Sequence, residues 1–260
     1  DVSNFDTSKV NTMQNMFYNC SNLTQLDVSN FNTSNVTSMY CMFYNCNKLT
    51  QLDVSNFNTS NVVNIGYMFS NCSNLTQLDV SNFDTSKVTN IHAMFNNCNN
   101  LTQLDVSNFD TSKVIDIQSM FTNCKSLTTL DVSNFNTSNV TNMSGVFRDC
   151  NSLAEIVGLG NWDVTKVSSM NMMFHNLPSL ISLDLSNWTT SSLVDTTNDG
   201  EDGGLFSYCS NLQRLDISNF DTSKVTNMKR MFSGCKNLTQ LDVSNFDTSQ
   251  ATTMRSMFYG

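Results

Sequence analysis

The hydrophobic and polar positions of the chain form one pattern that repeats from end to end. A large aromatic residue marks each repeat, and successive markers are 26 residues apart, except for one step of 27 and one of 32. A fixed period of this length is typical of a solenoid, in which each coil buries its apolar face only against its neighbours. The markers are Phe5, Phe31, Phe57, Phe83, Phe109, Phe135, Trp162, Trp188, Phe220 and Phe246.

Within one repeat, the spacing of the apolar residues changes halfway along. Residues 25–29 alternate between polar and apolar, which predicts a short strand with one buried face. The polar residues 30–34 predict a corner, with Phe31 as its internal plug. Apolar residues then recur three or four positions apart, so we expect a short second strand over 36–39 and one or two helical turns ending near Cys46.

These repeats predict a single solenoid over residues 1–260, with about ten repeats whose strands stack in parallel. The pattern is irregular between residues 154 and 205, where Gly158-Leu159-Gly160 replaces the usual Asp-Val-Ser segment and a six-residue insertion follows Trp188. Both ends of the sequence fall inside a repeat, so we expect the chain to be truncated at both ends relative to a longer protein.

The net charge of −9 is essentially that of one aspartate column at the end of the first strand. Carboxylates stacked about 4.8 Å apart repel one another by on the order of 1 kcal/mol per neighbour even in water. We expect hydrogen bonds from corner N–H groups or nearby serines to offset this, with bound Ca²⁺ as the alternative. A nucleic-acid partner is excluded, because it needs a basic stripe. The column comprises Asp1, Asp27, Asp53, Asp79, Asp105, Asp131, Asp184, Asp216 and Asp242.

A second polar column changes in pairs. Where it holds an aspartate, a lysine usually stands three residues later, as in Asp84 and Lys87. Where it holds an asparagine, another asparagine follows, as in Asn32 and Asn35. A local ion pair or amide pair across the corner explains this switch.

Eight of the nine cysteines share one register of the repeat. Stacked equivalent residues point the same way, so their Cβ atoms do not converge as a disulfide requires, and we expect reduced thiols that fill the core. Metal ligation is less favoured, because no Cys-x-x-Cys pair or partnering histidine accompanies them. Cys41 lies outside this register and is the thiol that we expect to be reactive.

The variation that bears on recognition lies between the second strand and the cysteine column. All six tyrosines and both histidines of the chain fall in this segment, together with several basic residues. Frame positions repeat and these do not, which favours a scaffold that displays a recognition surface; weakly restrained solvent positions are the alternative. The candidate ligand-binding residues are Tyr18, Tyr40, Tyr44, Tyr67, His92, Arg148, Lys229 and Arg230.

The insertion holds a weak candidate for a Ca²⁺ site in Asp195, Asp199 and Glu201. Asp, Thr and Asp stand at alternate positions before a glycine, as in a calcium loop. Phe206 occupies the place of the bidentate glutamate that such a loop requires. We therefore expect a mobile acidic loop and no cofactor, with Ca²⁺ kept as the alternative.

Residues 74–83 and 100–109 both read Asn-Leu-Thr-Gln-Leu-Asp-Val-Ser-Asn-Phe. Together with the following Met-Phe-x-x-Cys motif, this repeat resembles the 26-residue repeat of bacterial surface proteins, the lipoprotein-type relatives of BspA-like leucine-rich repeat proteins. The resemblance covers the whole chain. It implies a leucine-rich-repeat-like solenoid outside the cell, on the surface of a Gram-positive bacterium or a mycoplasma, in proteins thought to mediate adhesion.

An enzyme is not expected, because His92 and His175 lie in separate repeats without an identifiable nucleophile or matched carboxylate. The leading hypothesis is a cell-surface binding module whose partner is a host or bacterial surface protein or glycan. No membrane insertion is expected from this chain, and self-association is left open. A purely structural stalk is the main alternative. A third hypothesis, an ice-binding plane built from the threonine column that includes Thr33, is disfavoured by the corner position of that column.

Overall fold

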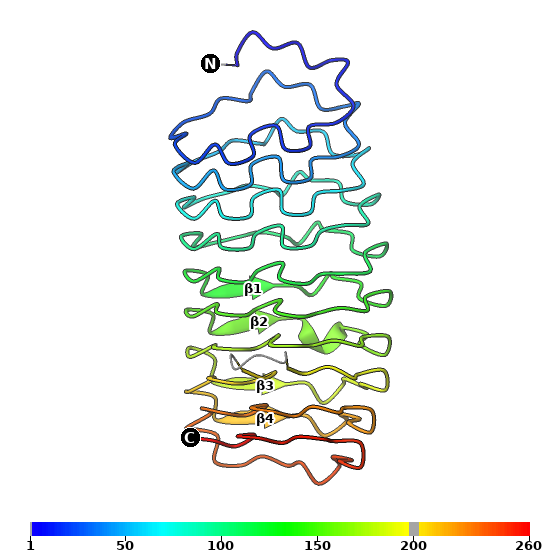
Figure 1. Cartoon of the computed structure of the whole chain (residues 1–260). Helices are drawn as coiled ribbons and strands as arrows, with labels where there is room; N and C mark the ends of the chain where they lie inside the picture. Colours follow the sequence, from blue (N-terminus) through cyan, green and yellow to red (C-terminus); the bar gives the residue numbers. More distant parts are fainter. Residues whose placement is uncertain (1, 198–202) are drawn as a thin grey trace.

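The computed structural model describes residues 2–197 and 203–260, which form coils stacked in register along one axis, with the termini at opposite ends (Figure 1). Strand β1 (Thr129–Asp131) pairs in parallel with β2 (Glu155–Val157), and β3 (Ser182–Asp184) with β4 (Arg214–Asp216). These strands contain the predicted first-strand motif, and in Figure 1 they lie one above another. The predicted solenoid of stacked parallel strands is confirmed.

The core is continuous from Met13 to Met257. Two aromatic columns run through it. The marker residues form one, and Phe31 is only 3% exposed, as predicted. A second column runs from Phe17 to Phe258, with stacked rings whose centroids lie 5.5 to 6.0 Å apart. Because every coil contributes both rings, each coil is stabilised mainly by its two neighbours.

The helical turns expected before Cys46 are wrong, and the segment forms successive β-turns instead. Alternate backbone N–H groups of residues 39–45 donate to carbonyl oxygens of the next coil, as Phe43 does to Met68 at 2.9 Å. A helix would keep those N–H groups within the segment. Cys41 and Asn45 adopt positive φ angles of 54° and 59°, which break the helical path between the turns. The expected second strand is reduced to single bridging residues, such as Ser38.

We call the surface formed by residues 39–45 and their equivalents in other coils the turn side. The surface that carries β1–β4 and the aspartate column is the strand side. On the strand side, side chains join the coils. Thr33 Oγ1 donates to the carbonyl oxygen of Asn58 at 3.0 Å and accepts the Asn58 N–H at 2.7 Å. Asn56 Nδ2 donates to the carbonyl oxygen of Ser29 at 2.9 Å. Thr33 is 2% exposed and its equivalents from Thr7 to Thr222 are also buried, which argues against an ice-binding plane.

The lysine of the second polar column does not contact the aspartate of its own corner, although after the Ser86 hydrogen bonds its charge also helps to lower the pKa of Asp84. Lys87 Nζ donates to Asn61 Oδ1 of the preceding coil at 2.7 Å, and Lys113 Nζ donates to the Ser86 carbonyl oxygen at 2.8 Å. The Asp84 carboxylate instead accepts the N–H of Ser86 at 3.0 Å in the manner of an Asx turn, as Asp110 accepts that of Ser112 at 2.9 Å. The lysine therefore links neighbouring coils and does not close its own corner.

All nine cysteines are free thiols, as predicted. In the shared register, the cysteines from Cys46 to Cys235 donate to carbonyl oxygens of a neighbouring coil, for example Cys98 Sγ to Phe69 at 3.2 Å. Burial raises the pKa of the Cys98 thiol to about 12, which keeps it protonated and unreactive. The prediction that Cys41 is reactive is wrong, because Cys41 is 5% exposed and burial raises its pKa.

The irregular region keeps the stack through local adjustments. Gly158 has φ 95° and precedes the 3₁₀ helix η1 (Leu159–Asn161), and a Cβ atom there would lie 2.2 Å from the Ser133 Cα. Only glycine fits this approach. At the insertion, Thr197 and Gly204 form an antiparallel bridge on the turn side. This bridge joins the described residues on either side of the insertion.

Candidate functional site

Five of the predicted ligand-binding residues form one contiguous surface on the turn side, which we call the aromatic face: Tyr18, Tyr40, Tyr44, Tyr67 and His92. Tyr18 stacks on Tyr44 with ring centroids 4.8 Å apart. Tyr67 contacts Tyr40 edge to face at 5.8 Å and Tyr44 at 6.3 Å, and it lies 4.9 Å from the His92 ring. Residues from four coils thus meet because the coils stack in register.

The local backbone explains how these side chains reach the surface. Tyr67 occupies a left-handed position, with φ 56°, at the register of Cys41 and Ala93. A left-handed conformation costs on the order of 1 kcal/mol in a residue with a Cβ atom. The neighbouring coils offset this cost with backbone hydrogen bonds, such as the Tyr67 N–H to the His92 carbonyl oxygen at 2.8 Å.

A hollow of about 450 Å³ opens at the end of the aromatic face, and we call it the Asp116 hollow. Its two apolar contributions come from the Tyr rings and from Ile115, which is 60% exposed. Sequence reasoning missed Ile115 and Asp116. The signal was available, because they replace Thr and Asn of the neighbouring repeats, as at Thr89. The hollow is lined by Tyr40, Tyr67, Thr89, Asn90, His92, Ile115 and Asp116.

The carboxylate of Asp116 is held in place by three neighbours. Its Oδ1 accepts the Gln118 N–H at 2.7 Å, while His92 Nδ1 lies 3.5 Å and Asn142 Nδ2 3.4 Å from its Oδ2. Burial alone raises the pKa of Asp116, but the bonds from His92 and Gln118 outweigh it and leave the pKa below its usual value. His92 therefore does have a matched carboxylate, contrary to the sequence-based expectation.

The basic candidates do not join this face. Arg148 lies on another coil, where its Nε contacts Asp149 Oδ2 at 3.1 Å. Arg230 Nη1 lies 3.4 Å from the Tyr208 hydroxyl, and Lys229 is 9% exposed. The eight candidates thus divide between one aromatic cluster and separate basic positions nearer the carboxyl end.

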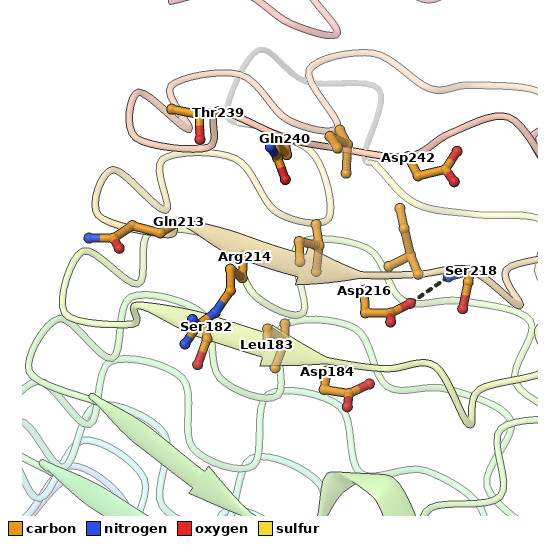
Figure 2. Close-up of a pocket in the computed structure, with 13 residues that line it drawn as sticks. Ser182, Leu183, Asp184, Gln213, Arg214, Asp216, Ser218, Thr239, Gln240 and Asp242 are labelled. Atoms are coloured by element: carbon orange, nitrogen blue, oxygen red, sulfur yellow. Dashed lines mark hydrogen bonds between the residues drawn. The ribbon is translucent and has the colours of Figure 1, made fainter.

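A second hollow, of about 1220 Å³, lies on the strand side over β3, β4 and the coil that follows. Figure 2 shows Asp184, Asp216 and Asp242 in a row, with Arg214 extending from β4 towards Ser182 on β3. Sequence reasoning missed Arg214, although it is the one cation at a register that holds Gln in most other repeats. The lining of this hollow is more polar than apolar and carries the carboxylates of the aspartate column.

The aspartate column is stabilised as expected by its serine neighbours. Asp79 Oδ1 accepts the Ser81 N–H at 3.0 Å and the Ser81 hydroxyl at 2.6 Å, and these bonds lower the Asp79 pKa. Asp131 makes the same pair of bonds with Ser133. Hydrogen bonding to the charged form offsets part of the repulsion along the column.

Of the calcium candidates, only Asp195 lies in the described part of the chain; Asp199 and Glu201 fall outside it. Asp195 Oδ2 accepts the Ser169 hydroxyl at 2.8 Å, and its Oδ1 lies 3.3 Å from the Thr197 N–H. Residues 2–197 and 203–260 contain no group of three His, Cys, Asp or Glu side chains arranged to hold a metal ion. A Ca²⁺ ion here stays a prediction.

His175 also has a partner that sequence reasoning missed. Its Nδ1 lies 2.7 Å from Ser207 Oγ, which also contacts the backbone of Gly204. Ser207 is fully buried and His175 is 6% exposed, so the contact fixes the turn next to the insertion. A nucleophile must reach its substrate, and this buried serine does not provide one.

The comparisons with known proteins agree with the repeat. A family model described as "Mycoplasma protein of unknown function, DUF285" matches residues 1–104, 93–199 and 183–260. No curated protein matches the chain. Within the described residues, no helix has the length and apolar character needed to cross a bilayer.

Several solved structures are similar at low identity. A leucine rich repeat protein of T. pallidum is 19% identical, with a TM-score of 0.37, and the match covers 78% of this chain and 72% of that one. A leucine rich cell surface protein of Faecalibacterium prausnitzii is 18% identical, with a TM-score of 0.38 and coverage of 89% and 77%. A leucine-rich repeat protein of Bacteroides ovatus is 15% identical, with a TM-score of 0.36 and coverage of 92% and 78%.

Proposed function

We propose that this chain, which belongs to the family described as "Mycoplasma protein of unknown function, DUF285", is a binding module of the bacterial cell surface. Three matches of the family model together span the chain. In this proposal the aromatic face contacts a protein or glycan of a host or neighbouring cell, as in an adhesin. The location outside the cell rests on the resemblance of the repeat to those of bacterial surface proteins.

The observation that supports this proposal is the contact among tyrosines of separate coils. Tyr18 is 45% exposed while its ring still stacks on Tyr44, so a broad aromatic surface remains open to solvent. Tyrosine contributes contact area and a hydrogen-bonding tip at low entropic cost, and it is enriched where proteins bind one another. A frame that only had to stack would not need aromatic residues there.

The test is binding of the purified protein to an array of mucins, matrix proteins and glycans, with and without Ca²⁺. The matched variant combines Tyr18→Asn, Tyr40→Gln, Tyr44→Asn and Tyr67→Ala, which are the residues of other repeats at the same registers. We expect the variant to lose at least about tenfold in affinity, since such aromatic anchors dominate binding energy. Its thermal midpoint should change little, because each new residue already occurs at that register.

Tyr259→Ser is the control, since Tyr259 is 74% exposed and lies outside the aromatic face. Equal loss in the control, or unchanged affinity in the fourfold variant, would refute this placement. A ligand that binds only with Ca²⁺ would direct attention to the aspartate column and Asp195.

A structural stalk is the second candidate, because the aromatic column from Phe17 to Phe258 runs the length of the stack and supports a stiff spacer. A stalk requires no varied surface, so exchange of whole coils should leave its function intact. Absence of any saturable ligand on the array would favour it over the binding module.

A further inference from the structure

The Asp116 hollow combines three features that match one kind of side chain. The Tyr40 and Tyr67 rings meet edge to face, and the electron-rich face of a tyrosine ring attracts a cation. Ile115 offers an apolar wall against which the methylene stem of a long side chain can pack. Asp116 supplies a carboxylate whose side chain is 38% exposed. We propose that the hollow receives a lysine or arginine side chain of a protein partner.

This inference rests on the proposed function and deepens it by naming the chemistry of the contact. The geometry around Asp116 leaves room for a further donor. Its Oδ1 makes a short bond to the Gln118 N–H, but the two contacts of Oδ2, to His92 and Asn142, are 3.5 and 3.4 Å long. Contacts of this length are weak, so Oδ2 can still accept a short, charge-assisted bond.

The charge of the hollow selects against other ligands. Asp116 and His92 are its ionisable side chains besides the two tyrosines, and the chain as a whole carries −9, so an anion is repelled. A neutral sugar could stack on the rings and donate a hydroxyl to the carboxylate, but it would lack the charge–charge attraction that a cation gains from Asp116. In the two adjacent repeats, Thr and Asn stand where this coil has Ile115 and Asp116. This coil therefore gains a charge and an apolar surface together.

The probe is N-acetyl-arginine amide, titrated into the ¹⁵N-labelled protein and followed by amide chemical shifts. We expect saturable shifts at residues 40, 67, 92, 115 and 116, with a dissociation constant on the order of 10 mM for one isolated cation. N-acetyl-citrulline amide has the same shape without the charge, and we expect it to bind about fivefold more weakly. Added salt should weaken the arginine probe and leave the citrulline probe unchanged.

The decisive variant is Asp116→Asn. Asparagine stands at the same register in Asn90 and Asn142, where its Oδ1 accepts the equivalent backbone N–H at 3.1 and 3.0 Å, so the variant should keep its fold. We expect it to bind the arginine probe about fivefold more weakly. Asp84→Asn is the control, because it removes one equal charge on another surface and mimics Asn58. It should bind like the unaltered protein.

Several outcomes would overturn the proposal: equal binding of arginine and citrulline probes, no effect of Asp116→Asn, or stronger shifts from methyl β-glucoside than from arginine. The two proposals fail separately. If the fourfold tyrosine variant loses an array ligand while arginine causes no shifts, the surface binds but the cation site is wrong. If arginine binds at Asp116 while the tyrosine variant keeps its array ligands, the cation site stands and the placement of those ligands on the aromatic face is wrong.

Discussion

The strand side and the turn side hold the same coils together by different means. On the strand side, buried side chains such as Thr85 make hydrogen bonds between coils, and the residue types repeat. On the turn side, backbone groups make those bonds, as between Phe95 and Met120 at 3.0 Å, and several side-chain positions vary freely. A solenoid can therefore vary its exposed side chains where backbone bonds help to join the coils.

This difference predicts that acid causes the largest loss of stability, and that the strand side loses its hydrogen bonds before the turn side does. Hydrogen bonds from Ser81 and Ser133 lower the pKa values of Asp79 and Asp131. The equivalent serines do the same for Asp27, Asp53, Asp105, Asp184 and Asp242. A carboxylate whose pKa is lowered on folding contributes stability that is present above its unfolded pKa of about 4 and is lost as the pH falls through its folded pKa. We expect the free energy of unfolding to be level above about pH 5 and to fall below pH 4.

Hydrogen exchange measured as the pH decreases would check this order, after correction for the intrinsic pH dependence of exchange. Serine amides that donate to the column, such as Ser81, should lose protection before turn-side amides such as Phe95. Simultaneous loss on both sides would show that the two surfaces do not differ in acid sensitivity.

A buried side-chain bond on the strand side should be the next largest effect. Thr85→Val keeps the shape of a side chain that is 2% exposed but removes the partner of both the N–H and the carbonyl oxygen of Asp110. We expect a loss of about 2 kcal/mol in the free energy of unfolding, because buried groups without partners cost about 1–3 kcal/mol. Urea unfolding followed by circular dichroism measures it.

The turn-side counterpart of that variant is His92→Gln, which copies Gln118 at the same register. It should cost less than about 1 kcal/mol, since the backbone bonds of the coil stay in place. If the two variants lose the same free energy of unfolding, side chains do not contribute more to joining the coils on the strand side than on the turn side.

The smallest expected effect is a gain in stability on the turn side. Ser119 has φ 56°, and Gly145 occupies the same register in the next coil with φ 64°. Ser119→Gly should raise the free energy of unfolding by about 0.5 kcal/mol, because glycine avoids the steric cost of a Cβ atom in the left-handed conformation but loses more conformational freedom on folding. A higher urea midpoint at unchanged slope would show it. A lower midpoint would mean that the serine side chain contributes more than the backbone costs.

The sequence by itself determined the features that depend on the period. Equivalent residues of stacked coils must lie side by side, so the repeat alone placed Phe31 in the core, aligned the buried thiols and brought the tyrosines of successive repeats to one surface. The serine partners of the aspartate column followed from the same logic, since they are only two residues away.

Only the tertiary structure decided which groups bond between coils. Helical spacing between Val36 and Cys46 was misleading, because N–H groups of this segment are taken by the next coil. Lys87 reaches the preceding coil and not its own aspartate for a similar reason. The contact of His92 with Asp116 spans a full coil, so neither residue identifies the other within one repeat. These pairings depend on the offset between coils, and that offset is fixed by packing and not by local spacing.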